Sequence, residues 1–306
     1  MRRLLARLGL AWLGWLLFLL LRRERVPHFD PPQTHPLRLP GRTVFVDDLE
    51  VFFREAGPPD APPVLLIHGW GDHSLVVFHR IIPLLTDRFR VIAPDNRNTG
   101  KSDVVRGPFE IADVADEMAG LIETLGLGAV DVVGYSMGGM VAEELARRRP
   151  DLVRRLVLAG TASTPPNLGG IARHVAPIAI AVVRAAERLT RTFHTAGRTS
   201  WLVRQGAVAP EHRRWAWTQH ASRDPDLYWE AGAAVARWDS AEWIGDLDMP
   251  VLVIINTADE VLATRAQYEL AARIRDARVV EVVGAHHAGP LTHAEVYADA
   301  IASFLR

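Results

Sequence analysis

The sequence predicts a doubly wound α/β fold with a mostly parallel sheet, a helical cap insertion and an N-terminal hydrophobic helix. Apolar runs such as VLLIHG and FRVIAPD, typical of strands buried on both faces, alternate with segments of helical periodicity. The alternation lapses between residues 161 and 246 and resumes with MPVLVIINTADE. A long apolar stretch flanked by arginines lies near the N-terminus. These observations together favour a layered core with one inserted unit.

Composition limits the classes of function. The chain has 306 residues, enough for one large domain, and 49% of them are hydrophobic, which is ordinary for a globular protein. The formal net charge is −1, and no stripe of basic residues is interleaved with aromatic ones, so nothing indicates a nucleic-acid partner. The absence of cysteine excludes disulfides, cysteine-based zinc sites and thiol nucleophiles.

Residues 1–26 are predicted to form a membrane-anchor segment. Leu8 to Leu21 is uninterruptedly apolar, but fourteen helical residues span only about 21 Å of a ~30 Å hydrocarbon core. Residues 4–7 extend the helix towards spanning length if an arginine snorkels, so we expect membrane association through residues 4–21. A cleaved signal peptide, and hence secretion, is the alternative, although arginines stand where a cleavage site would lie. An interfacial helix is less favoured, because the stretch has no polar face.

A proline-rich linker, residues 27–41, leads into the alternating segments. The first part of the core, residues 42–160, opens with two short strands, TVFVDD and EVFFREAG. It continues with the strands VLLIHG, FRVIAPD, AVDVVGY and RRLVLAG, and with the helices IADVADEMAGLIETLG and MGGMVAEELARRRP. The second part, residues 247–306, contains the strands MPVLVIINTADE and RVVEVVG, each followed by a helix.

The cap insertion, residues 161–246, is mostly helical in pattern and contains six of the nine tryptophans. These are Trp201, Trp215, Trp217, Trp229, Trp238 and Trp243. They could line an apolar acyl pocket, because substrate sites are mostly apolar and aromatic. For any single tryptophan, packing of a cap helix onto the core is the more common role.

A candidate nucleophile lies in the segment Gly134-Tyr135-Ser136-Met137-Gly138, which fits the pattern G-x-S-x-G between a strand and a helix. The sharp turn needs the small residues Gly134 and Gly138, and it lifts the serine hydroxyl out of the sheet. It also places the N–H of Met137 at a helix N-terminus, where it can stabilise an oxyanion. The pattern predicts that Ser136 is a catalytic nucleophile.

Such a serine needs a base, and the base needs an orienting acid. Asp259 follows the strand VLVIINTA at its carboxyl end, where open α/β sheets place their sites, although it could simply cap the next helix. Glu260 is the alternative acid. The base is sought in GAHHAGPLTH, which offers His286, His287 and His293.

Four segments of this sequence resemble the α/β-hydrolase superfamily, of the single-chain type with a helical cap. They are HGWGDHS (His68 to Ser74), GYSMGGMVAEELARRRPDLVRRLVLAG, NTADEVL and HHAGPLTHAEVYADAIASFL. The resemblance covers about residue 64 to the C-terminus, with the cap matching only in kind. It implies that the N–H of Trp70 is a second oxyanion donor, that His68 and Gly69 shape its loop, and that no metal or organic cofactor takes part.

The resemblance also bears on the choice of histidine. Counting back from the final helix places Ile301 and Phe304 where the family carries Ile and Phe, which makes His287 the base. His286 then stands where the family usually has glycine, and it remains the alternative base.

The stretch DNRNTGKSD, residues 95–103, ends like a phosphate-binding P-loop. A P-loop, however, needs glycine where Asp95 stands and a helix directly after the serine, whereas Gly107-Pro108 breaks any helix here. The segment instead resembles the family's D-x-R-G-x-G-x-S loop, with Asn98 in place of the first glycine. We therefore reject nucleotide binding.

Taken together, the sequence predicts a serine esterase (a carboxylesterase-like or lipase-like enzyme) that cleaves a small-molecule carboxylic ester through Ser136, Asp259 and His287 and an acyl-enzyme. The N-terminal anchor and the tryptophan-rich cap favour an apolar or lipid-like acyl group. A C–C bond hydrolase and a cofactor-free perhydrolase are alternatives that would use the same three residues. An alternative of another class is a catalytically inactive, membrane-tethered binding protein.

Overall fold

The computed structural model describes residues 37, 39–164, 181–182, 184–185 and 193–306. The predicted membrane segment, most of the predicted linker and part of the predicted cap lie outside these residues. Within the described residues, no helix has both the length and the apolar character needed to cross a bilayer.

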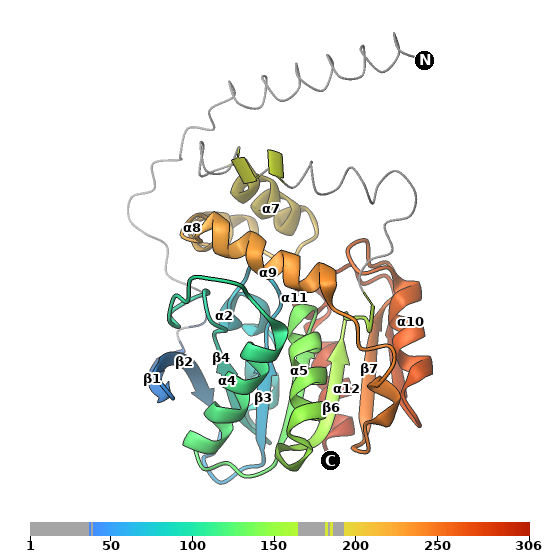
Figure 1. The fold of residues 1–306 in the computed structure, drawn as a ribbon. Helices are drawn as coiled ribbons and strands as arrows, with labels where there is room; N and C mark the ends of the chain where they lie inside the picture. Colours follow the sequence, from blue (N-terminus) through green and yellow to red (C-terminus); the bar gives the residue numbers. More distant parts are fainter. Residues whose placement is uncertain (1–36, 38, 165–180, 183, 186–192) are drawn as a thin grey trace.

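An eight-stranded sheet forms the centre of the molecule, with strand order β1-β2-β4-β3-β5-β6-β7-β8 (Figure 1). The first two strands and the β2–β4 pair are antiparallel, and every other pair is parallel, as predicted. The strands are β1 (Gly41–Val46), β2 (Leu49–Ala56), β3 (Pro63–Ile67), β4 (Arg90–Pro94), β5 (Val130–Tyr135), β6 (Val153–Ala159), β7 (Val251–Asn256) and β8 (Arg278–Val282).

Helices cover both faces of the sheet, which confirms the doubly wound prediction. One buried apolar cluster joins the sheet to α4 (Ile111–Thr124), α5 (Met137–Arg148) and α10 (Thr264–Arg273). A second cluster joins the opposite face to α2 (Ser74–Phe78), α3 (Ile82–Leu85) and α12 (Ala294–Phe304). Successive residues of β5 belong to different clusters, because side chains alternate across a strand.

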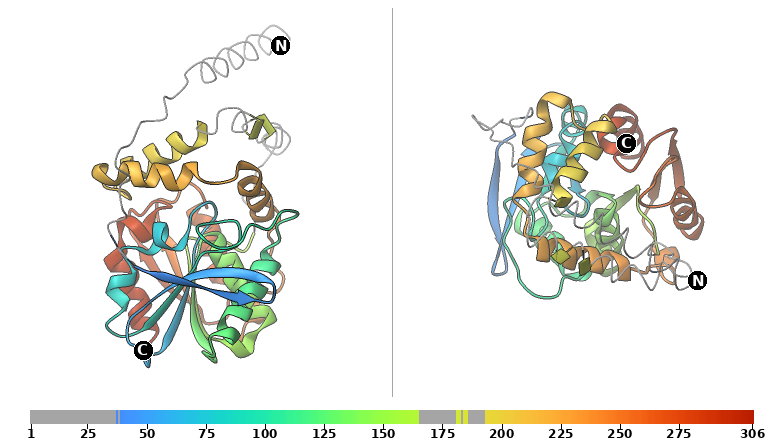
Figure 2. Two further views of the ribbon diagram at one scale, coloured as in Figure 1. Left: turned by 90° about the vertical axis from the view of Figure 1, so that its left-hand side faces the viewer. Right: turned by 90° about the horizontal axis from the view of Figure 1, so that it is seen from above.

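The described cap helices lie between β6 and β7 in the chain and sit over one end of the strands (Figures 1 and 2). They are α7 (Phe193–Arg204), α8 (Arg213–Ala221) and α9 (Pro225–Arg237). The side chain of Asp224 caps α9 by accepting from the N–H groups of Asp226 and Leu227, and Pro225 occupies the first helical position.

Three cap tryptophans have packing roles. Trp215 is buried in a small cluster with Leu202 and with Leu291 of α11 (Gly289–Thr292), so this cluster joins the cap to the loop that carries His287. Trp238 and Trp243 pack edge to face and contact the main core. The described part of the cap is therefore anchored to the core through apolar contacts at two places.

Candidate active site

Ser136 lies on a strained turn between β5 and α5. Its φ of 55° and ψ of −123° are unusual for a residue with a side chain. The two glycines of the motif allow the turn, because a Cβ on Gly134 would lie 2.3 Å from the carbonyl oxygen of Gly138. A Cβ on Gly138 would lie 2.1 Å from the carbonyl oxygen of Ile67. Local sterics therefore require small residues at both positions, as the motif predicts.

The structure brings together Ser136, His287 and Asp259, which the sequence places far apart. The hydroxyl of Ser136 lies 3.0 Å from Nε2 of His287. Nδ1 of the same ring lies 2.8 Å from Oδ2 and 3.1 Å from Oδ1 of Asp259. This is the chain of nucleophile, base and acid that a serine hydrolase needs.

Asp259 is held rigidly at the end of β7. Its Oδ1 accepts from the N–H groups of Val261 and Leu262, each at 2.9 Å, and its Oδ2 accepts from Nε2 of Gln267 at 3.0 Å. The residue that caps α10 is Ala263, so Asp259 does not cap that helix. Its carboxylate instead closes the turn before α10 while facing His287.

The electrostatics keep this carboxylate charged. Burial by itself would raise the pKa of Asp259, but the hydrogen bond and charge of His287 and the two backbone N–H donors outweigh it and lower the pKa. An ionised carboxylate can only accept, so it requires the proton on Nδ1 of His287. Nε2 is then free to accept the proton of the Ser136 hydroxyl, which is the tautomer needed for general-base chemistry.

The alternative acid and the alternative base pair with each other instead. Nδ1 of His286 lies 2.9 Å from Oε2 of Glu260, and both side chains are exposed to solvent. The third candidate, His293, has Nδ1 at 2.8 Å from the hydroxyl of Thr292. Among the three histidines, the imidazole hydrogen-bonded to the Ser136 hydroxyl is that of His287.

The loop after β3 lies directly against the nucleophile. A Cβ on Gly69 would lie 3.0 Å from Cβ of Ser136 and 3.4 Å from its hydroxyl oxygen, so this residue gives the loop its close approach. His68 is fully buried; its Nε2 accepts from the N–H of Asn96 at 2.9 Å, and burial lowers its pKa to about 4. A neutral, immobilised His68 shapes the loop, in agreement with the sequence-based expectation.

The two predicted oxyanion donors flank this contact. Trp70 follows Gly69 directly, and Met137 is the first residue of α5, so its N–H lies at a helix N-terminus. Among the described residues, no cluster of three or more acidic or histidine side chains is arranged to hold a metal ion.

Sequence reasoning missed Tyr135, although it lies inside the motif. Its buried hydroxyl donates to the carbonyl oxygen of His287 at 2.5 Å, and the centroid of its ring lies 5.4 Å from that of the imidazole. Tyr135 thus ties the backbone of the histidine loop to the strand that carries the serine. The only available signal was the aromatic residue before the serine, and its partner lies 152 positions away.

Comparison with known proteins finds similar sequences and structures. A family model described as alpha/beta hydrolase fold matches residues 62–194. The chain is 29% identical over 263 residues to a pimeloyl-[acyl-carrier protein] methyl ester esterase of Neisseria meningitidis serogroup B, covering 82% of this chain and 96% of that protein. It is 27% identical over 271 residues to a bifunctional esterase/perhydrolase of Acinetobacter calcoaceticus, covering 85% and 97%. The structure of a hydrolase from Pseudomonas aeruginosa PA01 superposes with a TM-score of 0.75 at 25% identity, covering 89% and 99%.

The chain has the α/β-hydrolase fold.

In this fold, the loop of residues 95–103 is arranged around the buried carboxylate of Asp95. Its Oδ1 accepts from Arg54 at 3.0 Å and from the hydroxyl of Ser74 at 2.6 Å, and its Oδ2 accepts from the N–H of Lys101 at 3.2 Å. A Cβ on Gly100 would lie 2.0 Å from Oδ2. The Gly-Lys-Ser segment therefore turns around an internal carboxylate.

Proposed function

We propose that this protein is a serine hydrolase that cleaves carboxylic esters of small molecules, with Ser136 as nucleophile, His287 as general base and Asp259 as orienting acid. The observation that carries the proposal is the 3.0 Å contact between the Ser136 hydroxyl and Nε2 of a histidine whose Nδ1 is held by Asp259. The esterases and hydrolases among its relatives support an ester-hydrolysing enzyme.

In the proposed reaction, the Ser136 oxygen attacks the ester carbonyl carbon while its proton passes to Nε2 of His287. The oxyanion of the tetrahedral intermediate accepts from the N–H groups of Trp70 and Met137. The intermediate collapses to an acyl-enzyme, and the imidazolium returns the proton to the departing alcohol. Water, deprotonated by the same nitrogen, then hydrolyses the acyl-enzyme and restores the Ser136 hydroxyl. The proposed reaction uses no metal or organic cofactor.

For the substrate, we propose an apolar or lipid-like acyl group, as the tryptophan content of the cap suggests. Assay of p-nitrophenyl esters from acetate to palmitate tests this. A rise of kcat/KM with chain length supports the proposal, whereas acetate as the only good substrate contradicts it.

A second candidate activity is perhydrolysis, because one relative is named an esterase/perhydrolase. In that reaction hydrogen peroxide replaces water in attack on the acyl-enzyme, and the product is a peracid. Peracid formation from acetate ester and peroxide, lost with Ser136→Ala, would establish it alongside esterase activity.

Labelling of the full chain with a fluorophosphonate probe tests the nucleophile. We expect the adduct on the peptide that contains Ser136 and no adduct in Ser136→Ala. His287→Ala should abolish labelling as well, whereas the matched variant His286→Ala should retain it. A folded wild-type protein that neither reacts with the probe nor hydrolyses any ester would contradict the proposal and favour a catalytically inactive binding protein.

A further inference from the structure

Trp70, whose N–H is a proposed oxyanion donor, is held by the cap through its side chain. Its indole Nε1–H donates to the carbonyl oxygen of Tyr228 in α9 at 2.6 Å. The two rings stack at a centroid distance of 4.4 Å. One turn further along α9, Gly232 makes room for the indole, since a Cβ there would lie 2.4 Å from Cζ2 of Trp70. The position of Trp70 therefore depends on α9.

Two residues further along the same loop, Asp72 is bound by two other cap helices. Its Oδ2 accepts from the guanidinium of Arg198 in α7, and its Oδ1 lies 3.1 Å from Nε2 of His220 in α8. Nδ1 of His220 lies 3.1 Å from the hydroxyl of Thr199 in α7, so the network joins both helices. Asp72 is almost wholly buried, and leaving it unpaired there would be strongly destabilising.

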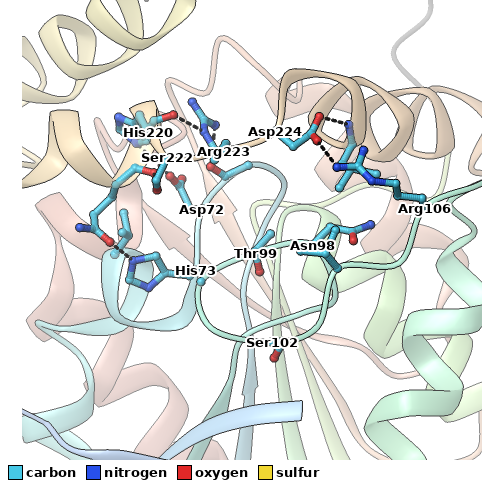
Figure 3. A pocket seen from close by; sticks show the side chains of 16 residues that line it. Asp72, His73, Asn98, Thr99, Ser102, Arg106, His220, Ser222, Arg223 and Asp224 are labelled. Atoms are coloured by element: carbon cyan, nitrogen blue, oxygen red, sulfur yellow. Dashed lines mark hydrogen bonds and ion pairs between the residues drawn. The ribbon is translucent and has the colours of Figure 1, made fainter. Parts of the chain in front are cut away.

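The remaining residues of the loop make cap contacts too. Nη1 of Arg223, between α8 and α9, donates to the carbonyl oxygen of Gly71 at 2.7 Å. Nε2 of His73 lies 2.9 Å from Oε1 of Gln219 in α8. Figure 3 shows His220 and Arg223 above the loop that carries Asp72 and His73, around a pocket of about 200 Å³. Four consecutive residues, 70–73, thus each bond to the cap.

Electrostatics strengthen the contact at Asp72. Burial by itself would raise its pKa, but the charge of Arg198 and the hydrogen bond from His220 outweigh it and hold the pKa well below its usual range. The carboxylate is therefore charged at neutral pH, which makes its hydrogen bonds to the cap charge-assisted and stronger than neutral ones.

We infer that the cap positions the oxyanion hole: α9 and the Asp72 network together hold the loop that carries the Trp70 N–H, so Asp72 and Gly232 are positioning residues for the reaction. This inference rests on the proposed function. An oxyanion donor contributes only when its N–H lies at hydrogen-bond distance from the developing charge, so a small displacement of the loop lowers kcat. Opening of the cap would then disable the site as well as uncover it.

The sharpest test is a pair of glycine-to-alanine variants in cap helices. In Gly232→Ala the new methyl group meets the indole of Trp70, whereas in Gly197→Ala, in α7, it meets no atom of the described residues within 4 Å. Both changes raise helix propensity to the same extent, so propensity cancels in the comparison. The readouts are kcat and KM for a p-nitrophenyl ester, the affinity for an alkyl boronic acid that forms a tetrahedral adduct, and the thermal unfolding midpoint.

We expect Gly232→Ala to lower kcat by about tenfold to a hundredfold, less than the 10²–10³ lost with a whole oxyanion donor. KM should stay within about threefold, and boronate affinity should fall with kcat, because only transition-state binding is lost. The pH at which kcat/KM is half-maximal should not move, since Ser136, His287 and Asp259 are untouched. Gly197→Ala should stay within about twofold of wild type in every readout.

The Asp72 network supplies a second, independent set of variants. Asp72→Asn should show the same loss of kcat, and Arg198→Lys, which keeps the charge, should retain more activity than Arg198→Ala. A folded Gly232→Ala with kcat and boronate affinity equal to Gly197→Ala would overturn the inference, as would a change confined to KM. Wild type without turnover would overturn the proposed function, and the inference with it.

Discussion

Nδ1 of His286 lies 2.9 Å from Oε2 of Glu260, while the next residue, His287, faces the next acid, Asp259, at 2.8 Å. Two adjacent histidines thus pair with two adjacent acids, one pair at the solvent and one beside the serine. The α/β-hydrolase sequences that this chain resembles usually have glycine at position 286. Here a histidine is accommodated because it pairs with Glu260 at the solvent, and we call these two residues the outer pair. Glu260 also accepts from Nε1 of Trp201 in α7 at 3.2 Å, so the outer pair reaches the cap.

The two histidines should differ greatly in their effect on activity. His287→Ala removes the group that takes the serine proton, and kcat should fall by about 10⁴ or more, as for removal of a triad base. His286→Ala removes a solvent-exposed pair and should cost less than about tenfold, because exposed pairs contribute little. Ester hydrolysis at pH 7 by both variants, purified in parallel, measures this. Equal losses would mean that His287 is not the base.

Asp259→Asn should lower kcat by about 10⁴ with little change in fold, since an amide can present its N–H to Nδ1 and so favour the wrong tautomer. Glu260→Gln is the matched control, and it should cost less than about tenfold because Glu260 accepts from the backbone N–H of His287, at 3.4 Å, and pairs with the ring of His286. Steady-state kinetics with one ester, together with the unfolding midpoint of each variant, distinguish lost chemistry from lost stability. If both amide variants were equally active, Asp259 would have no orienting role.

A buried carboxyl group makes stability fall as pH rises. Oε2 of Glu143 in α5 lies 2.6 Å from the Ser240 hydroxyl and 3.3 Å from Nε1 of Trp238, and burial raises the pKa of Glu143 to about 8. Its folded pKa lies above the unfolded one, so the folded state retains a proton between about pH 4.5 and 8 that the unfolded state has released. The contribution of protonated Glu143 to the free energy of unfolding is therefore fully present below about pH 4.5 and is lost as pH rises to about 8.

We expect Glu143→Gln to remove this fall in the free energy of unfolding, because glutamine does not titrate. Urea unfolding at pH 5 and at pH 8.5 should show the free energy of unfolding falling more in wild type than in the variant. The difference between the two falls should reach roughly a few kcal/mol, given 1.4 kcal/mol for each pKa unit. If the free energy of unfolding fell by the same amount in both proteins, the Glu143 carboxyl would not titrate between these two pH values.

For localisation, we propose that residues 4–21 attach the protein to a membrane. The full chain should remain in the membrane fraction after an alkaline carbonate wash, and a chain lacking residues 1–26 should be released. Mass spectrometry of the mature N-terminus tests the alternative, because a cleaved signal peptide would give a shortened chain outside the cell. Release of an intact full chain by the wash would contradict the anchor.

The sequence by itself determined the succession of the strands and of the longer core helices along the chain, and the position of the serine turn. Both are local properties: apolar periodicity identifies strands and helices, and the sterics of the turn require glycine at 134 and 138. The short helices α2 and α3 were not predicted, because five and four residues are too few to show a helical period. The acid could be placed after β7 for a related reason, since sites on open sheets lie at the carboxyl ends of strands.

The resemblance favoured His287 and left His286 as the alternative, and only the tertiary structure shows that His287 faces Ser136, because no local pattern distinguishes the directions of two adjacent side chains. The tertiary structure also revealed that Tyr135 contacts the histidine loop and that Asp72 contacts the cap. These contacts join residues more than a hundred positions apart. They depend on how the cap and the sheet pack together, and the free energy of such packing is a property of surfaces that meet only after folding.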